Sequence, residues 1–363
     1  MAILVISLDG MTDLAFEAMS GAPATYPNIA RFKEQSHYRG GVKTMFVSNT
    51  YPIHASIATG KLPKEHGITS NYVETERGRR WAQLASYIQA ETLWDAAHKR
   101  GLSTAAILWP ITCGAKNIRW NFPETHIHGW ENQLVESLRQ GSRGFQLGAF
   151  LRHGEKLLRG IGQPGLDRFT TAVTCDLLRK RRPDLTLLHL IAYDTLSHRN
   201  GSKSEKLDLA RRALDECLGK LLEAAGDTTV LVFSDHGHLD VAEVIDLTQF
   251  LGDALLEQCG GSAFLTHPVA GVDSHPWFGR FLTARELDES GFSARGAVSG
   301  IAANPGYTFG TGSHRSDHGY PADYENYQVF YAVRCNAAPL EPVYGDVRDI
   351  TAIIVNKLGL TMP

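Results

Sequence analysis

Three short apolar runs, each followed by an aspartate, constrain the fold most strongly. They cover residues 2–8 before Asp9, residues 185–193 before Asp194, and residues 228–234 before Asp235. Continuous apolar runs of this length are typical of strands buried on both faces, as in a parallel sheet covered by helices. Because the carboxyl ends of parallel strands lie along one edge, we expect the three carboxylates to gather there. Each aspartate alone could belong to a simple turn after its strand. Burying three carboxylates together costs much free energy unless cations neutralise them.

The segments between these runs indicate an α/β protein. Helices are predicted around residues 26–36, 91–100, 166–180 and 204–225, and further strands around 103–109 and 327–333. Apolar residues recur at helical spacing in the helix at 204–225, so we expect it to pack on the sheet. The irregular span from about 112 to 163 predicts an insertion or lid. We expect one α/β domain over residues 1–363, with a mostly parallel central sheet and helices on both faces.

Composition narrows the function class. The formal net charge is −3 and 43% of the residues are hydrophobic, which is typical of a globular protein and gives no sign of nucleic-acid binding. No apolar run is long enough to span a membrane, and the N-terminal run is too short for a signal peptide. Five widely spaced cysteines include no Cys-x-x-Cys pair, which favours a reducing compartment. We therefore expect a cytoplasmic protein. Charge and composition name no partner, and the oligomeric state is left open.

The stretch from residue 47 to residue 71 places a hydroxyl, that of Thr50, at a boundary between a loop and a helix. Pro52 suits a first helical turn, and Ile53 and Ile57 then recur at helical spacing. The start of a helix carries unpaired amides and a partial positive charge, so it attracts phosphate. The alternative interpretation is that Thr50 only caps the helix.

Histidines lie close to the strand-ending acids along the chain. The candidate ligands, carboxylate, imidazole and hydroxyl, are Asp9, Thr50, Asp194, His198, Asp235, His236 and His318. Such a set suits two divalent metal ions, and its three histidines favour Zn²⁺. His198 also fits a surface histidine beside Arg199, because Asp-x-x-x-His spacing is frequent by chance.

The order of these motifs resembles the alkaline phosphatase superfamily, and within it the type I phosphodiesterase/nucleotide pyrophosphatase branch. The resemblance spans residues 3–333 and is most specific in Ser-Asp-His-Gly at 234–237 and Thr-Gly-Lys-Leu-Pro-Lys-Glu-His-Gly at 59–67. It implies an alkaline phosphatase-like fold and hydrolysis of phosphodiester or nucleotide pyrophosphate bonds through a phosphothreonine on Thr50. The resemblance assigns one zinc ion to Asp194, His198 and His318, and the other to Asp9, Asp235 and His236, with Thr50 bridging towards both. His318 is preferred over His314 because it lies in the Asp-His-Gly motif.

The substrate side of the resemblance is less complete. The branch often has an asparagine three residues after the nucleophile, where this chain has Ile53. The contact to the phosphate oxygen is then expected from the Thr50 amide, from the metal ions or from another side chain such as that of Asn71. Tyr51 matches an aromatic residue that stacks on a base or aryl group. The expected substrate is a small phosphate ester, possibly a nucleotide. A phosphomonoesterase or phosphonate hydrolase on the same scaffold is the alternative, and a non-catalytic metal-binding protein ranks last because all seven positions are filled.

Overall fold

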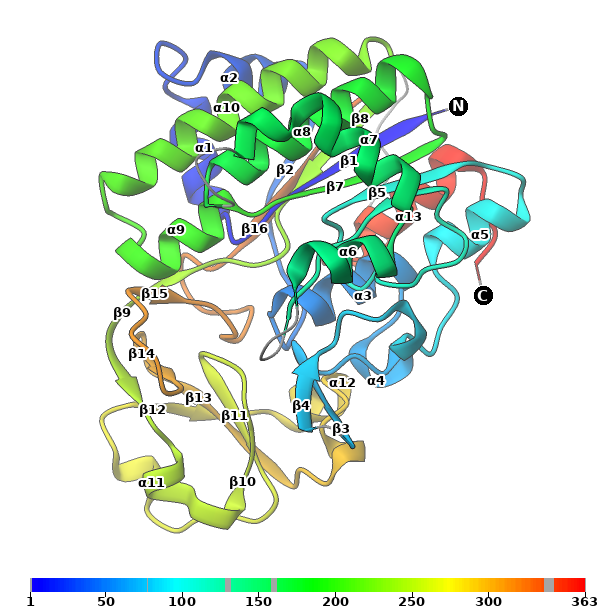
Figure 1. Cartoon of the computed structure of the whole chain (residues 1–363). Coiled ribbons are helices and arrows are strands. Elements are labelled where there is room, and N and C mark those ends of the chain that lie inside the picture. The colour runs from blue at the N-terminus through cyan, green and yellow to red at the C-terminus, as the bar shows by residue number, and fades with distance from the viewer. Residues whose placement is uncertain (1, 77, 128–131, 158–161, 336–342, 363) are drawn as a thin grey trace.

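The computed structural model describes residues 2–76, 78–127, 132–157, 162–335 and 343–362, and it is built around a seven-stranded sheet (Figure 1). The strand order is β2-β16-β8-β1-β7-β5-β6. The bounds are β1 Ile3–Leu8, β2 His37–Val42, β5 Thr104–Ile107, β6 Trp120–Phe122, β7 Leu185–Leu190, β8 Thr229–Phe233 and β16 Val329–Arg334. β1 pairs in parallel with β7 and β8, whereas β16 is antiparallel to both of its neighbours. The predicted, mostly parallel sheet is confirmed.

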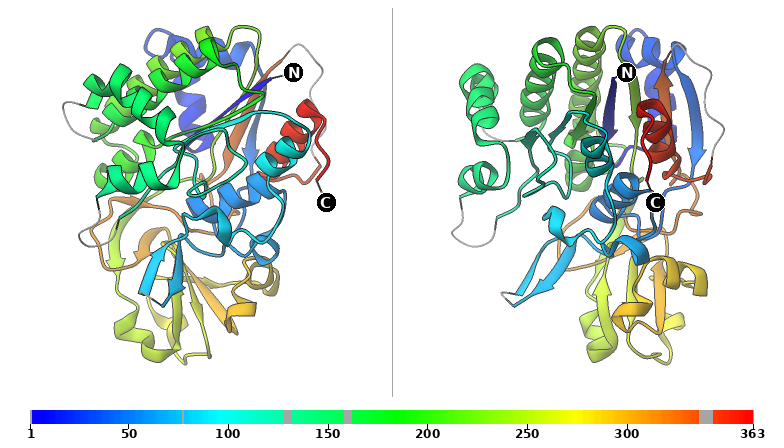
Figure 2. Two further views of the ribbon diagram at one scale, coloured as in Figure 1. Left: turned by 45° about the vertical axis from the view of Figure 1, so that its right-hand side comes forward. Right: turned by 90° about the vertical axis from the view of Figure 1, so that its right-hand side faces the viewer.

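Helices cover both faces of this sheet because its central strand is apolar on both sides. Leu4 and Ile6 of β1 pack into one hydrophobic core, and Ile3 and Val5 pack into another. The first core is closed by α1 Asp13–Ser20, α2 Pro27–Glu34, α8 Gly165–Lys180, α9 Ala192–Asn200 and α10 Lys206–Ala225. The second is closed by α3 Thr50–Thr59, α5 Leu93–Lys99 and α13 Asp349–Leu358 (Figure 2).

The strand expected to end at Asp194 is shorter than predicted. β7 ends at Leu190, and Asp194 lies in the first turn of α9, with His198 one turn later. The buried Asp167 carboxylate accepts hydrogen bonds from the amides of Ile191 (3.2 Å) and Ala192 (3.0 Å). These contacts satisfy amides at the helix start, so the apolar run turns into a helix here instead of extending the strand.

The described part of the span 112–163 contains regular structure. β6 extends the edge of the central sheet by pairing in parallel with β5, and it is followed by α6 Gln133–Gln140 and α7 Arg143–His153. The side chain of Asn132 caps α6 by accepting hydrogen bonds from the amides of Leu134 and Val135. Residues 128–131 and 158–161 of the expected lid lie outside the described residues.

The chain between β8 and β16 forms a smaller β-rich lobe, which the sequence analysis did not predict (Figure 1). Its four-stranded sheet has the order β10-β11-β13-β12, and a three-stranded sheet has the order β14-β9-β15. The bounds are β9 Leu239–Ile245, α11 Thr248–Leu251, β10 Leu255–Gln258, β11 Ser262–Leu265, β12 Phe278–Phe281, α12 Ala284–Glu289, β13 Ser299–Ala303, β14 Gly306–Phe309 and β15 Ser316–Asp317. Leu247, Trp277 and Tyr320 help to form its core. His318 directly follows β15, so the lobe supplies one of the predicted ligands.

Two further small elements are the short helix α4 Pro63–His66 and a hairpin of β3 Tyr72–Thr75 and β4 Gly78–Trp81. In the ranges that the structure describes, no helix is both long and apolar enough to cross a membrane.

Candidate active site

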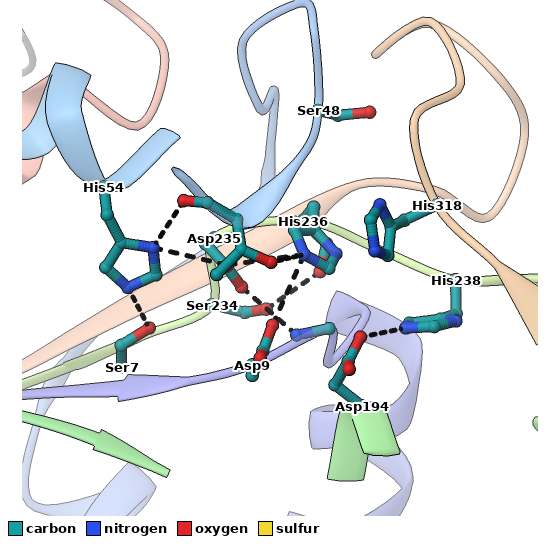
Figure 3. A network of polar contacts seen from close by, with 12 residues as sticks. Ser7, Asp9, Ser48, His54, Asp194, Ser234, Asp235, His236, His238 and His318 are labelled. Carbon is teal, nitrogen blue, oxygen red and sulfur yellow. Dashed lines mark hydrogen bonds and ion pairs between the residues drawn. The ribbon is translucent and has the colours of Figure 1, made fainter. Parts of the chain in front are cut away.

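The carboxyl ends of the central strands bring the predicted acids together (Figure 3). Asp9 directly follows β1, and Asp235 follows β8 after Ser234. Their residues are only 4% and 0% exposed. The amide of Gly10 donates a hydrogen bond to Oδ1 of Asp235 (3.1 Å), which joins the two strand ends directly. Parallel pairing of β1 with β8 therefore places the two carboxyl groups side by side.

Four overlapping groups of potential ligand atoms form among the described residues at this edge, including one of Asp194, His236 and His238 that the sequence analysis did not predict. Two of the four match the prediction. One contains Asp194, His198 and His318, and the other contains Asp9, Asp235 and His236; within each group the ligand atoms lie within 4.8 Å of one another. His236 Nε2 lies 3.3 Å from Asp9 Oδ1, and His198 Nε2 lies 3.4 Å from Asp194 Oδ1. These are the same two sets of residues that the sequence resemblance assigned to two metal ions.

His314 lies close to the first group, but it belongs to another group of potential ligands. Its Nδ1 is 3.2 Å from Nδ1 of His198, and it groups with His198 and Asp317. His198 Nδ1 also contacts the backbone carbonyl of Ser316 at 2.9 Å. The Nδ1 side of His198 thus faces the protein backbone, while its Nε2 side faces Asp194.

The unpaired atoms of the site fit divalent cations. Among the described residues, Asp9 Oδ1, Asp235 Oδ2 and His318 Nδ1 are buried without a hydrogen-bond partner. Burial and the neighbouring Asp194 raise the pKa of Asp9 well above its ordinary value. Burial lowers the pKa of His236 to about 3, so its imidazole is neutral, the form that binds metals. In the group of Asp9, Asp235 and His236, buried carboxyl groups beside a neutral imidazole are a donor set that a divalent ion stabilises. In the group of Asp194 and His198 the charge of Asp194 outweighs the effect of burial and raises the pKa of His198 to about 9, so an ion that binds there displaces a proton.

Thr50 is the first residue of α3 and contacts the second group. Its Oγ1 lies 3.2 Å from His236 Nε2, and the residue is 9% exposed. Asn49, not Thr50, occupies the N-cap position. The capping interpretation is therefore wrong, and the Thr50 hydroxyl faces the candidate ligands at the start of a helix.

The two predicted substrate contacts, Tyr51 and Asn71, lie next to Thr50, and both are buried. The Asn71 side-chain oxygen accepts a hydrogen bond from the Tyr51 amide (3.0 Å), which fixes the orientation of the Asn71 amide group. Tyr51 is only 1% exposed, because its ring packs against Trp81 at 5.6 Å and His126 at 6.2 Å between centroids. The prediction that Tyr51 offers an open ring face is therefore not supported. Partly exposed aromatic rings are instead those of Tyr72, Trp81 and His126.

Sequence reasoning missed three polar residues beside the site. His238 Nε2 lies 2.6 Å from Asp194 Oδ1, and the Nδ1 atom of His54 contacts the Thr50 carbonyl at 2.8 Å. The third is Glu124, whose carboxylate accepts a hydrogen bond from the Tyr51 hydroxyl (3.2 Å). His54 and His238 could have been found from their proximity to the Thr50 and Ser-Asp-His-Gly motifs. Nothing in the local sequence signals Glu124, because its partner is 73 residues away.

Solved structures share the whole fold at low sequence identity. Human ectonucleotide pyrophosphatase/phosphodiesterase 5 matches with a TM-score of 0.72 and 18% identity, covering 100% of this chain and 96% of that one. An inactive murine form of the same protein, solved in complex with AMP, matches with a TM-score of 0.71 and 16% identity, with the same coverage of both chains. Phosphonoacetate hydrolase from Sinorhizobium meliloti, in complex with phosphonoformate, matches with a TM-score of 0.67 and 19% identity, covering 98% and 95%.

Curated relatives are similar over about two thirds of this chain. An uncharacterised pyrophosphatase/phosphodiesterase of Schizosaccharomyces pombe is 24% identical over 252 residues, 65% of this chain and 44% of its own length. Ectonucleotide pyrophosphatase/phosphodiesterase family member 1 of Homo sapiens is 23% identical over 265 residues, 69% of this chain and 25% of its own. The match thus spans less than half of either relative. The family model of type I phosphodiesterase/nucleotide pyrophosphatase matches residues 3–276. The chain belongs to the type I phosphodiesterase/nucleotide pyrophosphatase family.

Proposed function

We propose that this protein is a metal-dependent hydrolase of phosphodiester or nucleotide pyrophosphate bonds that uses Thr50 as its nucleophile. The observation that carries the proposal is the position of the Thr50 hydroxyl: at the start of α3 and 3.2 Å from a histidine of one of two adjacent ligand groups. Family membership and the names of the relatives support the same chemistry.

The ligand groups hold two divalent ions, most favourably Zn²⁺. Asp194, His198 and His318 bind one ion, and Asp9, Asp235 and His236 bind the other. When bound, two such ions neutralise the buried carboxylates and stabilise negative charge on the attacking and leaving oxygens of an in-line displacement. Three histidines among the six ligands favour zinc over magnesium or calcium, which prefer oxygen ligands.

Thr50 performs the covalent step. Its hydroxyl loses its proton, Oγ1 forms a bond to phosphorus, and the bond from phosphorus to the leaving oxygen breaks; the leaving oxygen then takes up a proton. Water subsequently hydrolyses the phosphothreonine and restores the hydroxyl. The amides at the start of α3 attract the anionic phosphoryl group. The Asn71 side-chain oxygen accepts a hydrogen bond from the Tyr51 amide, so the NH₂ group of Asn71 is left to donate to a phosphate oxygen. Asn71 would thus take the role of the family's asparagine, whose position is occupied by Ile53 in this chain.

The competing function is hydrolysis of a monoester or a phosphonate on the same scaffold, as the phosphonoacetate hydrolase neighbour illustrates. Only the substrate pocket separates these activities, since Thr50 and the ligand groups would serve all of them.

A side-by-side assay tests the proposal. The purified, zinc-supplemented protein is assayed on matched aryl phosphodiesters and aryl phosphomonoesters, on dinucleotides and on phosphonoacetate, with Thr50→Ala as the control. We expect the highest kcat/KM for a diester or a pyrophosphate-linked nucleotide, and loss of turnover in the variant. A clear preference for the monoester or phosphonoacetate would overturn the proposal.

A further inference from the structure

A cavity away from the candidate active site lies between the helices α7 and α8, which are neighbours in the fold (Figure 1), and the edge strand β6. Its volume is about 540 Å³, which is within the range of small-molecule binding sites. None of the residues that line it belongs to the candidate metal ligands or to the segment around Thr50. The cavity is therefore a separate candidate binding site.

Two glycines of α7 leave this space open. Gly144 and Gly148 are four residues apart, so they lie on one face of the helix, and Arg152 continues the same row one turn later. Among the described residues, no atom beyond this turn of the helix lies within 4 Å of the place that a Cβ would take at Gly144. A side chain added at this position would therefore enter the cavity without a clash.

Apolar side chains form the inner wall of the cavity. Val173 and Leu177 are buried on adjacent turns of α8, and the partly buried rings of Trp120 and Phe145 pack against the core beside them. The Arg119 guanidinium lies 4.8 Å from the centroid of the Trp120 ring. An apolar wall that contains aromatic rings suits the organic part of a ligand, in particular a flat ring.

Positive charge gathers at the same cavity. Four cationic side chains line it, those of Arg119, Arg152, Lys180 and Arg181, but only one carboxylate, that of Asp176. Arg152 and Lys180 contact Asp176 at 3.1 Å and 2.8 Å. In the part of the chain that the structure describes, Arg119 and Arg181 have no carboxylate partner. Because the whole chain has a formal net charge of −3, this local excess of positive charge indicates an anionic ligand.

We propose that this cavity binds an organic phosphate with a flat organic group, the chemistry of a nucleoside monophosphate. The phosphate contacts Arg119 and Arg181, since guanidinium groups match the geometry of phosphate oxygens, and the organic group packs on the apolar wall. The inference does not rest on the proposed function, because binding here requires neither Thr50 nor the metal ligands.

Calorimetric titration of AMP into the zinc-loaded Thr50→Ala protein tests the proposal. Gly144→Met, added to this background, fills the cavity without changing its charge, and we expect the number of AMP molecules bound per chain to fall by one. Gly154→Met adds the same side chain at the other end of α7, where it also finds open space but does not line the cavity, and should leave the number unchanged. Thermal unfolding checks that each variant is folded.

Charge variants and simpler ligands give a second readout. Replacing both Arg119 and Arg181 by glutamine should weaken AMP binding at the cavity at least about tenfold. Arg139→Gln, which removes an exposed arginine of the neighbouring helix α6, should not. Adenosine and inorganic phosphate should each bind the cavity more weakly than AMP, because each lacks one part of the contacts.

Two results would overturn the proposal. One is an equal number of bound AMP molecules in the Thr50→Ala protein with and without a folded Gly144→Met substitution. The other is AMP binding at the cavity that is no tighter than the binding of adenosine or of inorganic phosphate. Both results concern binding without turnover, so they leave the proposed function standing.

Discussion

Replacing His238 tests whether the Asp194 group binds metal in the way the structure implies. His238 is buried, its Nε2 lies 2.6 Å from Asp194 Oδ1, and its Nδ1 contacts the hydroxyl of Ser316 at 3.0 Å. The imidazole therefore links Asp194, a proposed metal ligand, to β15, the strand that precedes His318. Partners that orient a ligand in this way contribute about 10- to 100-fold to metal affinity. We expect His238→Ala to weaken one of two zinc sites by this factor, about 1.4–2.8 kcal/mol.

Competition with a chelator at equilibrium measures this loss. One ion should leave His238→Ala at a chelator concentration about 10- to 100-fold lower than in the wild type, while the ion bound by Asp9, Asp235 and His236 stays. His238→Gln keeps a side-chain N–H donor for Asp194 and should lose less affinity. His267→Ala, which removes a half-exposed histidine from the same lobe, is the matched control. Unchanged zinc affinity in a folded His238→Ala protein would refute the reasoning.

Further predictions follow from single contacts. Elemental analysis should find close to two divalent ions per chain, predominantly zinc, and full activity without bound metal would contradict the proposal. Thr50→Ala should abolish turnover, and Thr50→Ser should retain some activity. Because Asn49 occupies the cap position, Thr50→Ala should change the free energy of unfolding by less than about 1 kcal/mol. A tenth of the wild-type rate in Thr50→Ala would refute the role of Thr50 as nucleophile. The buried His66 contacts the Ser56 hydroxyl at 2.8 Å, and burial lowers its pKa to about 3, below the value in the unfolded chain. The contribution of His66 to the free energy of unfolding is therefore complete above pH 6.5 and is lost as the pH falls towards 3, at up to about 1.4 kcal/mol per pH unit. Urea unfolding at pH 7 and pH 5 should show a smaller pH effect in His66→Asn; equal pH effects would contradict this assignment.

The central sheet and the position of the acids were predictable because both depend on local patterns. The apolar run of β1 reaches Asp9 without interruption, and that of β8 reaches Ser234 and Asp235, so strand ends and carboxylates could be identified together. The parallel pairing of β1 with β8 then places Asp9 and Asp235 at one edge.

The remaining features depend on contacts between distant residues. α9 begins at Ala192 because Asp167, 25 positions earlier, accepts its amide hydrogen bond, and an apolar sequence that continues through Tyr193 gives no local sign of this. The β-rich lobe consists largely of four-residue strands, which are too short to produce a clear alternation. The burial of Tyr51 depends on Trp81 and His126, which lie 30 and 75 residues further along the chain. The burial of its ring could therefore not be inferred from the sequence around Thr50.

The stereochemical outcome at phosphorus tests the central claim, covalent catalysis by Thr50, most directly. A phosphorothioate diester of known configuration is hydrolysed in ¹⁸O-labelled water by the zinc-loaded protein, and the configuration of the product is determined. Two successive in-line displacements, one by Thr50 and one by water, each invert the phosphorus centre, so the account predicts net retention. Net inversion would show that water attacks the substrate directly and would contradict a phosphothreonine on Thr50.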